Sequence, residues 1–225
     1  MAVELCHYRL ALRGKPVGSQ LLSVEERGHT ALLDAQLSLQ GSLGNADVRQ
    51  RSTVHQQRFF SFAFEEETRS SSERRSFSVT FDAEAGLVRA SRGSDQATAP
   101  YLQAFEDPLG LLYHLRRLGP DEVRLRVPML GKEVLVERLG DTELETVLGP
   151  RRAYAYVLQP GGSYVYVDQQ APHLILQLSQ RLDGQLLEAL LVRVDEEAAR
   201  PQPEATDSPR PRRRRSGRQR RRRKG

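Results

Sequence analysis

The sequence predicts a mainly β protein: a strongly curved antiparallel sheet or incomplete β-barrel packed around one short helix at residues 107–118, followed by a disordered basic tail. Many short segments alternate apolar and polar residues between turns that contain Gly or Pro. A single segment has clear helical spacing, and the last residues are almost entirely basic. Roughly ten or more antiparallel strands must curl or split into two sheets to protect their edges, so a β-sandwich is the alternative.

The helix at residues 107–118, DPLGLLYHLRRL, has clear start and stop signals. Asp107 can accept hydrogen bonds from free backbone N–H groups, and Pro108 suits the first helical position. Gly119 and Pro120 end the helix. One apolar stripe is formed by Leu111, Leu112, Leu115 and Leu118. Because a helix this short is marginal alone in water, we expect it to lie against the sheet.

The part of the chain before the helix reads as a series of strands. Alternating residues predict strands at 4–13, 19–27, 30–40, 58–65, 76–82 and 87–91. Gly14–Gly18 is expected to form the first turn, and Phe60, Phe62 and Phe64 share one face of the fourth strand. The polar residues 66–75 predict an exposed loop, and residues 93–99 predict a linker into the helix.

Beyond the helix the pattern is again that of a meander. Strands are expected at 123–127, 133–138, 143–148, 153–158, 164–168 and 174–178. Residues 160–162, Pro-Gly-Gly, suggest a hairpin that brings Tyr156 near Tyr166. Asp183-Gly184 predicts another hairpin turn. Residues 185–194 then favour a strand, although their leucine spacing also fits a helix.

The charge of the chain divides it into parts. The sequence has 34 Lys and Arg residues against 29 Asp and Glu residues, for a net charge of +5. Residues 210–225 hold eleven of the cations and no acid, so the rest has 23 cations, 29 acids and a charge of −6. We therefore expect a globular domain at 1–197, a disordered linker at 198–209 and a disordered Arg-rich tail at 210–225.

The N-terminal sequence and the cysteine count bear on the compartment. Cys6 is the single cysteine, which excludes an intrachain disulfide. No apolar run approaches the roughly 18 residues that span a membrane. The first residues, MAVELCHYRLAL, lack the basic and apolar regions of a signal peptide. The sequence as written predicts a cytoplasmic protein, and an envelope location would follow if the true start lies upstream.

The residues that carry chemistry in enzymes are sparse. The sequence contains no nucleophile elbow, phosphate-binding loop, dinucleotide-binding glycine motif or zinc-protease motif. The five histidines never fall at metal-ligand spacing, and His114 is notable only because it lies on the helix. We expect a protein that is not an enzyme, with no cofactor and no metal. A candidate pocket for a lipid-like or other apolar ligand, beside the helix, comprises Leu111, Leu112, Tyr113 and Leu115, although simple core packing is the favoured explanation of the helix stripe.

The tail, RPRRRRSGRQRRRRKG, has the composition of a phosphate-binding segment. Without an aromatic residue for stacking, we expect binding to RNA or DNA that is weak and independent of base sequence. An anionic membrane surface is a less favoured partner, and a tail that only solubilises the chain or folds back on the acidic body is the simplest alternative. The residues expected to contact phosphate are Arg210, Arg212, Arg213, Arg214, Arg215, Arg218, Arg220, Arg221, Arg222, Arg223 and Lys224.

Three stretches carry a resemblance to a known family: GKPVG at 14–18, VTFDAEAGLV at 79–88 and, above all, DPLGLLYHLR at 107–116. Over residues 1–197 the chain resembles an uncharacterised family of bacterial β-rich proteins, described as a domain of unknown function and commonly exported to the envelope. The resemblance implies an antiparallel β fold without established catalytic residues. The chain departs from that family in lacking an export signal and in adding the Arg-rich tail.

Overall fold

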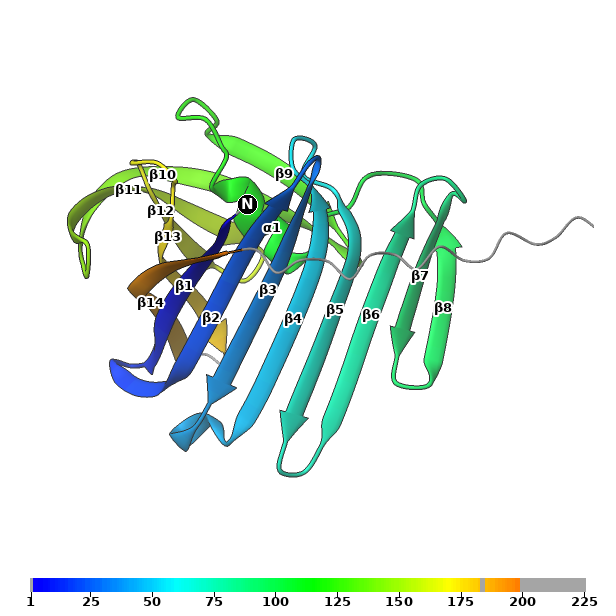
Figure 1. Cartoon of the computed structure of the whole chain (residues 1–225), viewed down its shortest axis with the longest axis horizontal. Coiled ribbons are helices and arrows are strands. Elements are labelled where there is room, and N and C mark those ends of the chain that lie inside the picture. The colour runs from blue at the N-terminus through cyan, green and yellow to red at the C-terminus, as the bar shows by residue number, and fades with distance from the viewer. Residues whose placement is uncertain (1, 183–184, 199–225) are drawn as a thin grey trace, which may run out of the picture.

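The computed structural model describes residues 2–182 and 185–198, which form a 14-stranded antiparallel sheet curved around a short helix (Figure 1). The helix is α1 (Pro108–Leu115), and a 3₁₀ turn occupies Gly41–Leu43. The strands are β1 (Ala2–Leu12), β2 (Lys15–Arg27), β3 (Thr30–Leu39), β4 (Ala46–His55), β5 (Ser61–Ser70), β6 (Arg74–Asp82), β7 (Leu87–Arg92), β8 (Asp95–Pro100), β9 (Arg124–Met129), β10 (Lys132–Thr146), β11 (Gly149–Gln159), β12 (Ser163–Asp168), β13 (Ile175–Leu182) and β14 (Gln185–Ala198).

The order of strands gives the sheet two distinct ends. The first and last strands pair in the middle of the sheet, so the order is β8-β7-β6-β5-β4-β3-β2-β1-β14-β13-β12-β11-β10-β9. Because neighbouring strands are antiparallel, the turns β1–β2, β3–β4 and β13–β14 share one end, which we call the open end. The helix, the start of β1 and the end of β14 lie at the other end, which we call the helix end (Figure 1).

The segment that leads into the helix closes the curve of the sheet. The Ser61 N–H, at the start of β5, donates to the Phe105 carbonyl at 2.8 Å, and the Glu106 N–H donates to the Pro128 carbonyl of β9 at 2.9 Å. This segment joins β5 to β9 at the helix end, while β6, β7 and β8 extend past the point of closure (Figure 1). The predicted incomplete barrel around one short helix is confirmed.

Alternation along the strands places an apolar layer on the inner face of the curve. Tyr8 and Leu10 of β1, Val54 of β4 and Val165 of β12 are almost fully buried, and they belong to one continuous core with the helix. Leu115 of α1 is also buried, as expected for a short helix that depends on tertiary packing. The core therefore lies between the helix and both halves of the sheet.

The structure contradicts three predictions for the polar stretches before the helix. Residues 46–55, for which no strand was predicted, form β4, and residues 66–75 are not a loop because β5 runs to Ser70 and β6 starts at Arg74. Residues 93–99 are not a linker, since β8 starts at Asp95. Ion pairs between neighbouring strands, such as Arg49 with Asp34 and Arg74 with Glu67, explain why polar sequences form strands here.

Several boundaries also differ from the predictions. The first turn is residues 13–14, both with positive φ, and residues 15–17 already belong to β2. The helix ends at Leu115 rather than residue 118, because hydrogen bonds from Arg117 and Leu118 tighten the chain into a shorter turn. Phe60 precedes β5, so it does not share that strand with Phe62 and Phe64.

The pairing of β11 with β12 overturns the predicted tyrosine contact. Tyr156 is opposite Val165, whereas Tyr166 is opposite Ala155, so the two tyrosines point to opposite faces of the sheet. The strand favoured for residues 185–194 is confirmed by β14. The predicted turn at 183–184, most of the predicted linker and the whole tail at 210–225 lie outside the described residues.

Candidate functional site

A cavity of about 390 Å³ lies inside the curve of the sheet, next to α1. Its volume falls within the range typical of small-molecule sites, which is roughly 300–1,000 Å³. The walls come from the helix and from strands in both halves of the sheet. The apolar residues that line the cavity are Leu10, Leu37, Pro108, Leu109, Leu111, Leu112, Met129, Val134, Leu158, Pro160, Val165, Leu178, Leu187 and Ala189.

The start of the helix is fixed in place by Asp107. Its Oδ1 accepts hydrogen bonds from the N–H groups of Leu109 and Gly110, both at 2.9 Å. Its Oδ2 accepts from the hydroxyls of Ser52 and Ser61 at 2.5 and 2.6 Å. Burial raises the pKa of the Asp107 carboxyl, and these four hydrogen bonds oppose that rise. The N-terminus of α1 is thereby joined to β4 and β5.

Gly110 lets the helix approach the sheet closely. A Cβ at this position would lie 3.2 Å from both the Ser61 hydroxyl and a methyl group of Val54. Gly is unfavourable inside a helix by roughly 1 kcal/mol relative to Ala, so close packing offsets its low helix propensity. The sequence motif alone did not reveal this contact.

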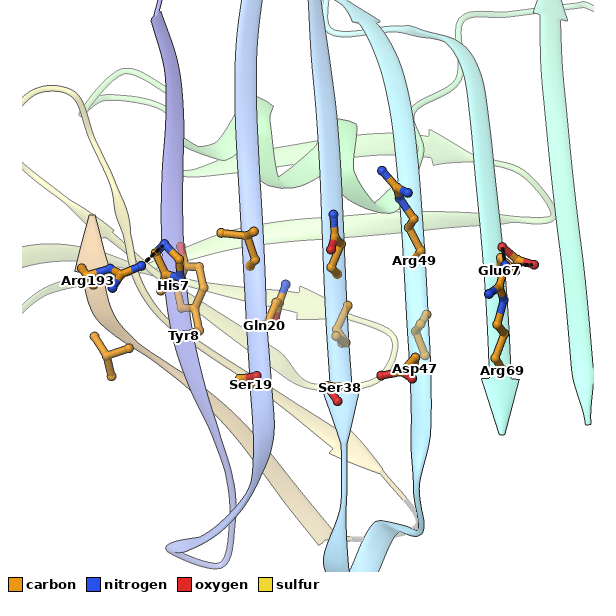
Figure 2. Close-up of a pocket in the computed structure, with 15 residues that line it drawn as sticks. His7, Tyr8, Ser19, Gln20, Ser38, Asp47, Arg49, Glu67, Arg69 and Arg193 are labelled. Atoms are coloured by element: carbon orange, nitrogen blue, oxygen red, sulfur yellow. Dashed lines mark hydrogen bonds and ion pairs between the residues drawn. The ribbon is translucent and has the colours of Figure 1, made fainter. Parts of the chain in front are cut away.

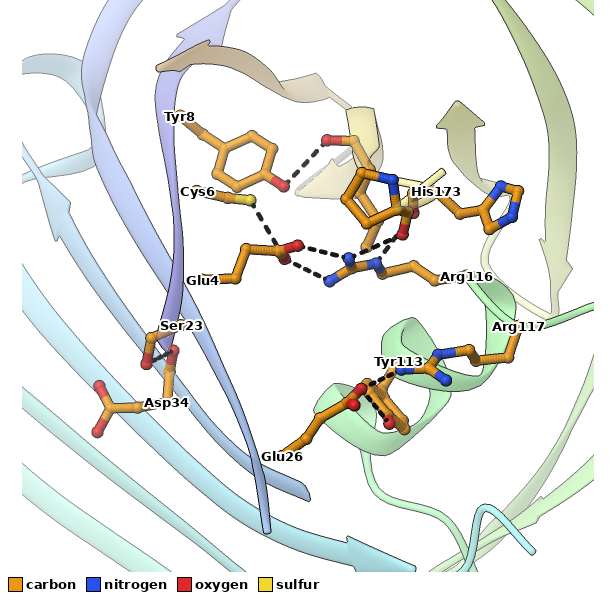
Figure 3. A network of polar contacts seen from close by, with 12 residues as sticks. Glu4, Cys6, Tyr8, Ser23, Glu26, Asp34, Tyr113, Arg116, Arg117 and His173 are labelled. Carbon is orange, nitrogen blue, oxygen red and sulfur yellow. Dashed lines mark hydrogen bonds and ion pairs between the residues drawn. The ribbon is translucent and has the colours of Figure 1, made fainter. Parts of the chain in front are cut away.

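The other end of the helix is held by a buried ion pair (Figure 3). The Arg116 guanidinium donates to both carboxylate oxygens of Glu4 at 2.7 and 2.9 Å, and to the carbonyls of Pro172 and His173 at 3.1 and 2.9 Å. Burial by itself would lower the pKa of Arg116, but Glu4 raises it above its usual value. Arg116 therefore joins the helix to β1 and to the loop between β12 and β13.

Beside this ion pair, further polar groups close the helix end (Figure 3). The Tyr113 hydroxyl donates to Glu26 of β2 at 2.8 Å, and Arg117 pairs with the same carboxylate. The Tyr8 hydroxyl donates to the Ile175 carbonyl at 3.0 Å. Burial raises the pKa of the Cys6 thiol to about 12, which leaves it protonated and a poor nucleophile.

Polar side chains make up a minority of the cavity wall: Gln20, Gln50, Lys132, Ser163, Tyr164, Ser179 and Gln180. Gln50 of β4 donates to Glu66 of β5 at 2.7 Å. Lys132, at the start of β10, is the single charged side chain among the described residues that line the cavity. A pocket with mainly apolar walls and some polar groups suits a mainly apolar molecule.

The four predicted pocket residues have two different roles. Leu111 and Leu112 line the cavity. Tyr113 and Leu115 are buried against the sheet and do not line it. The wall contributed by the strands was not identified from the sequence, because residues such as Ala189 and Met129 carry no functional signal of their own.

His114 packs against its neighbours, and its contacts do not resemble those of a catalytic histidine. Its ring stacks on Phe59 with centroids 4.0 Å apart, and its Nδ1 lies 2.9 Å from a carboxylate oxygen of Glu106. Burial raises the pKa of Glu106, while the contact with His114 opposes that rise. The second carboxylate oxygen of Glu106 is buried without a hydrogen-bond partner among the described residues.

A larger hollow, of about 780 Å³, crosses the outer face of β14, β1, β2, β3, β4 and β5 (Figure 2). Most of its charged side chains are already paired with neighbours: Arg49 with Asp34, Arg69 with Glu67, and Arg193 with Asp195. Since no set of polar groups converges on one point, this hollow is a weaker candidate than the inner cavity.

The described part of the chain shows neither a group of metal ligands nor a membrane-spanning helix. It contains no group of three or more His, Cys, Asp and Glu side chains placed to hold a metal ion. None of its helices is both long and apolar enough to cross a membrane.

Comparison with known proteins places the fold. No curated protein matches the sequence. One similar solved structure is the "Beta-barrel-like Protein of Domain of Unknown Function DUF1849 from Brucella abortus", with a TM-score of 0.56 and 8% identity over 88% of this chain and 99% of that chain. At this identity the likeness shows the fold alone. The family model described as "Protein of unknown function (DUF3108)" matches residues 7–183. The chain therefore belongs to this uncharacterised family of β-rich proteins.

Proposed function

We propose that the protein binds, and acts as a carrier for, an apolar or amphiphilic small molecule in the cavity beside α1. The observation that carries this proposal is the apolar wall, to which the helix contributes Leu111 and Leu112 and both halves of the sheet contribute the rest. Such a wall has few groups that could perform chemistry, but it can remove a hydrocarbon chain from water.

Burial of a ligand's hydrocarbon chain should make its affinity depend on the length of that chain. Each methylene group transferred from water into an apolar site contributes about 0.8 kcal/mol, which is about a fourfold change in Kd. Affinity for a series of linear alkyl ligands should therefore rise with chain length and level off once the cavity of about 390 Å³ is filled.

A cavity-filling substitution tests the proposal. Ala189 lies on β14 opposite Leu10 and Leu178 and lines the cavity, so Ala189→Phe should occupy the space that a ligand needs. We expect alkyl-ligand affinity, measured by isothermal titration calorimetry on the full chain, to fall by at least about tenfold. Native mass spectrometry of the protein purified without added ligand should show a bound apolar molecule that is absent from the variant.

The matched control is Ala97→Phe, which places the same side chain on the exposed strand β8. Its affinity should equal that of the native protein. Equal affinity in both variants would contradict the cavity as the site. If Ala189→Phe unfolds by circular dichroism, Leu112→Trp supplies a second filling variant, because Leu112 is only partly buried and lines the cavity.

A second function is supported by the charge division in the sequence. Residues 210–225 carry eleven Lys and Arg residues and no acid, whereas the rest has a charge of −6. Arginine pairs bidentately with phosphate, and such binding depends steeply on salt but little on base sequence. This composition supports weak association of the tail with RNA or DNA.

Truncation after Arg200 tests the tail separately from the cavity. Fluorescence anisotropy with a labelled RNA and a labelled DNA duplex should show that the full chain binds at low salt and loses affinity as salt rises. The truncated chain should lose this binding and keep its affinity for alkyl ligands. Equal nucleic-acid binding by the two chains would contradict a role for the tail.

A further inference from the structure

The cavity has a mainly apolar wall with one charged residue at its edge. Lys132 begins β10 directly after the β9–β10 turn, opposite Met129. Because residues alternate along a strand, Lys132 shares the inner face with the buried Val134 and Val136. Its neighbour Glu133 points to the other face, where it pairs with Arg126 at 2.7 Å. A cation therefore stands at the edge of an otherwise uncharged wall.

Lys132 also belongs to a group of unpaired cations. Most Arg residues in the described part of the chain have a carboxylate within ion-pair distance. Those Lys and Arg residues that make no ion pair with another described residue are Arg9, Arg13, Lys15, Arg58, Arg92, Lys132 and Arg181. Of these residues, Lys132 is the one that lines the cavity.

The charged groups beyond the C-terminal end of α1 are already paired. The guanidinium of Arg116 is fully engaged by Glu4 and two backbone carbonyls. Tyr113 and Arg117 are engaged by Glu26. A charged ligand group placed there would lose its hydration without gaining a free partner, which is costly. Lys132 is therefore the group that can hold the charge of a bound amphiphile.

We infer that the ligand is an amphiphile with an anionic head, carboxylate or phosphate, which enters chain-first and leaves its head beside Lys132. This inference rests on the proposed cavity function and adds the chemical class and orientation of the ligand. Gln20, which also lines the cavity, is uncharged, so the buried part of the ligand needs no charge to match it.

Four ligands that share one twelve-carbon chain test the head group. Calorimetry with the full chain should show that dodecanoate or dodecyl phosphate binds about fivefold more tightly than 1-dodecanol, and that dodecylamine binds least well. Comparison of the two anions separates a fatty-acid head from a lipid phosphate. Raising the salt concentration should weaken binding of the anions and leave 1-dodecanol unchanged.

Charge substitutions locate the contact. Lys132→Glu should weaken binding of the preferred anion by about tenfold, and Lys132→Gln by about fivefold, without changing the affinity for 1-dodecanol. Arg58→Glu, which changes an exposed and unpaired cation at the helix end, should leave both affinities unchanged. If no ligand binds, the proposed function itself fails. If all four bind equally, or if Lys132→Glu and Arg58→Glu behave alike, the cavity function survives and the anionic-head inference is overturned.

Discussion

The two ends of the sheet use charged side chains in different ways. At the helix end, Arg116 is buried and held by Glu4 and two carbonyls, and Asp107 is buried with four hydrogen bonds to its carboxylate. Arg13 and Lys15 at the open end, and Lys132 beside the β9–β10 turn, are exposed and make no ion pair with a described residue. Buried charges are stable only when fully paired, whereas exposed charges are solvated and free to bind.

The difference separates buried, paired groups from exposed, unpaired ones. The paired groups of the helix end fix α1 across the curve and close it, so this end should dominate stability. Lys132, exposed at the edge of the cavity, should influence binding more than folding. Matched substitutions in the two kinds of group test this difference.

The largest expected effect on stability is at the buried ion pair. Arg116→Ala leaves the Glu4 carboxylate and two carbonyls without their donor, and we expect the free energy of unfolding to fall by about 3 kcal/mol. Arg117→Ala removes the adjacent, exposed Arg, whose pair with Glu26 should be worth less than about 1 kcal/mol. Urea denaturation followed by circular dichroism measures both. Similar losses for the two variants would contradict a special role for the buried pair.

Two of the leucines of the helix, Leu112 and Leu115, give the next comparison. Leu115 is 1% exposed in the core, so Leu115→Ala should lower the free energy of unfolding by about 3 kcal/mol. Leu112 is only partly buried and already faces a cavity, so Leu112→Ala should cost about 1 kcal/mol. The same urea titration checks this difference. In contrast, Leu112→Ala should alter alkyl-ligand affinity more than Leu115→Ala does, and the reverse order would argue against a ligand beside this helix face.

The smallest effect concerns Glu106, whose pKa is raised by burial and whose neighbours include His114 and Asp107. A carboxyl with a raised folded-state pKa stabilises the protein below its unfolded pKa, and this contribution is lost as the pH rises through the folded pKa. Glu106→Gln removes this titration. We therefore expect the free energy of unfolding to fall less for the variant than for the native protein as the pH rises from about 4 to about 7. The free energy of unfolding measured across that range would show parallel curves if Glu106 does not contribute.

Local sequence signals were sufficient for the helix and for most strands. Asp107 and Pro108 mark the start of α1 because capping and the fixed φ of proline act within one turn. The alternation in β3, β9 and β12 likewise reflects a strand with one buried face. The stretches 46–55 and 66–75 gave no such signal, because polar and charged side chains occupy many of their positions and become favourable only beside the partner strand.

The sequence by itself determined that this protein is a β-rich meander with one central helix and a strongly basic C-terminal segment. Only the tertiary structure decided that β1 pairs with β14, that Glu4 meets Arg116 and that Ser52 and Ser61 meet Asp107. These contacts join residues far apart in the chain. The periodicity of apolar residues indicates the local conformation of a segment, but not which strand or side chain it contacts. The cavity follows from the same cause, since its wall exists only when the two halves of the sheet curve around the helix.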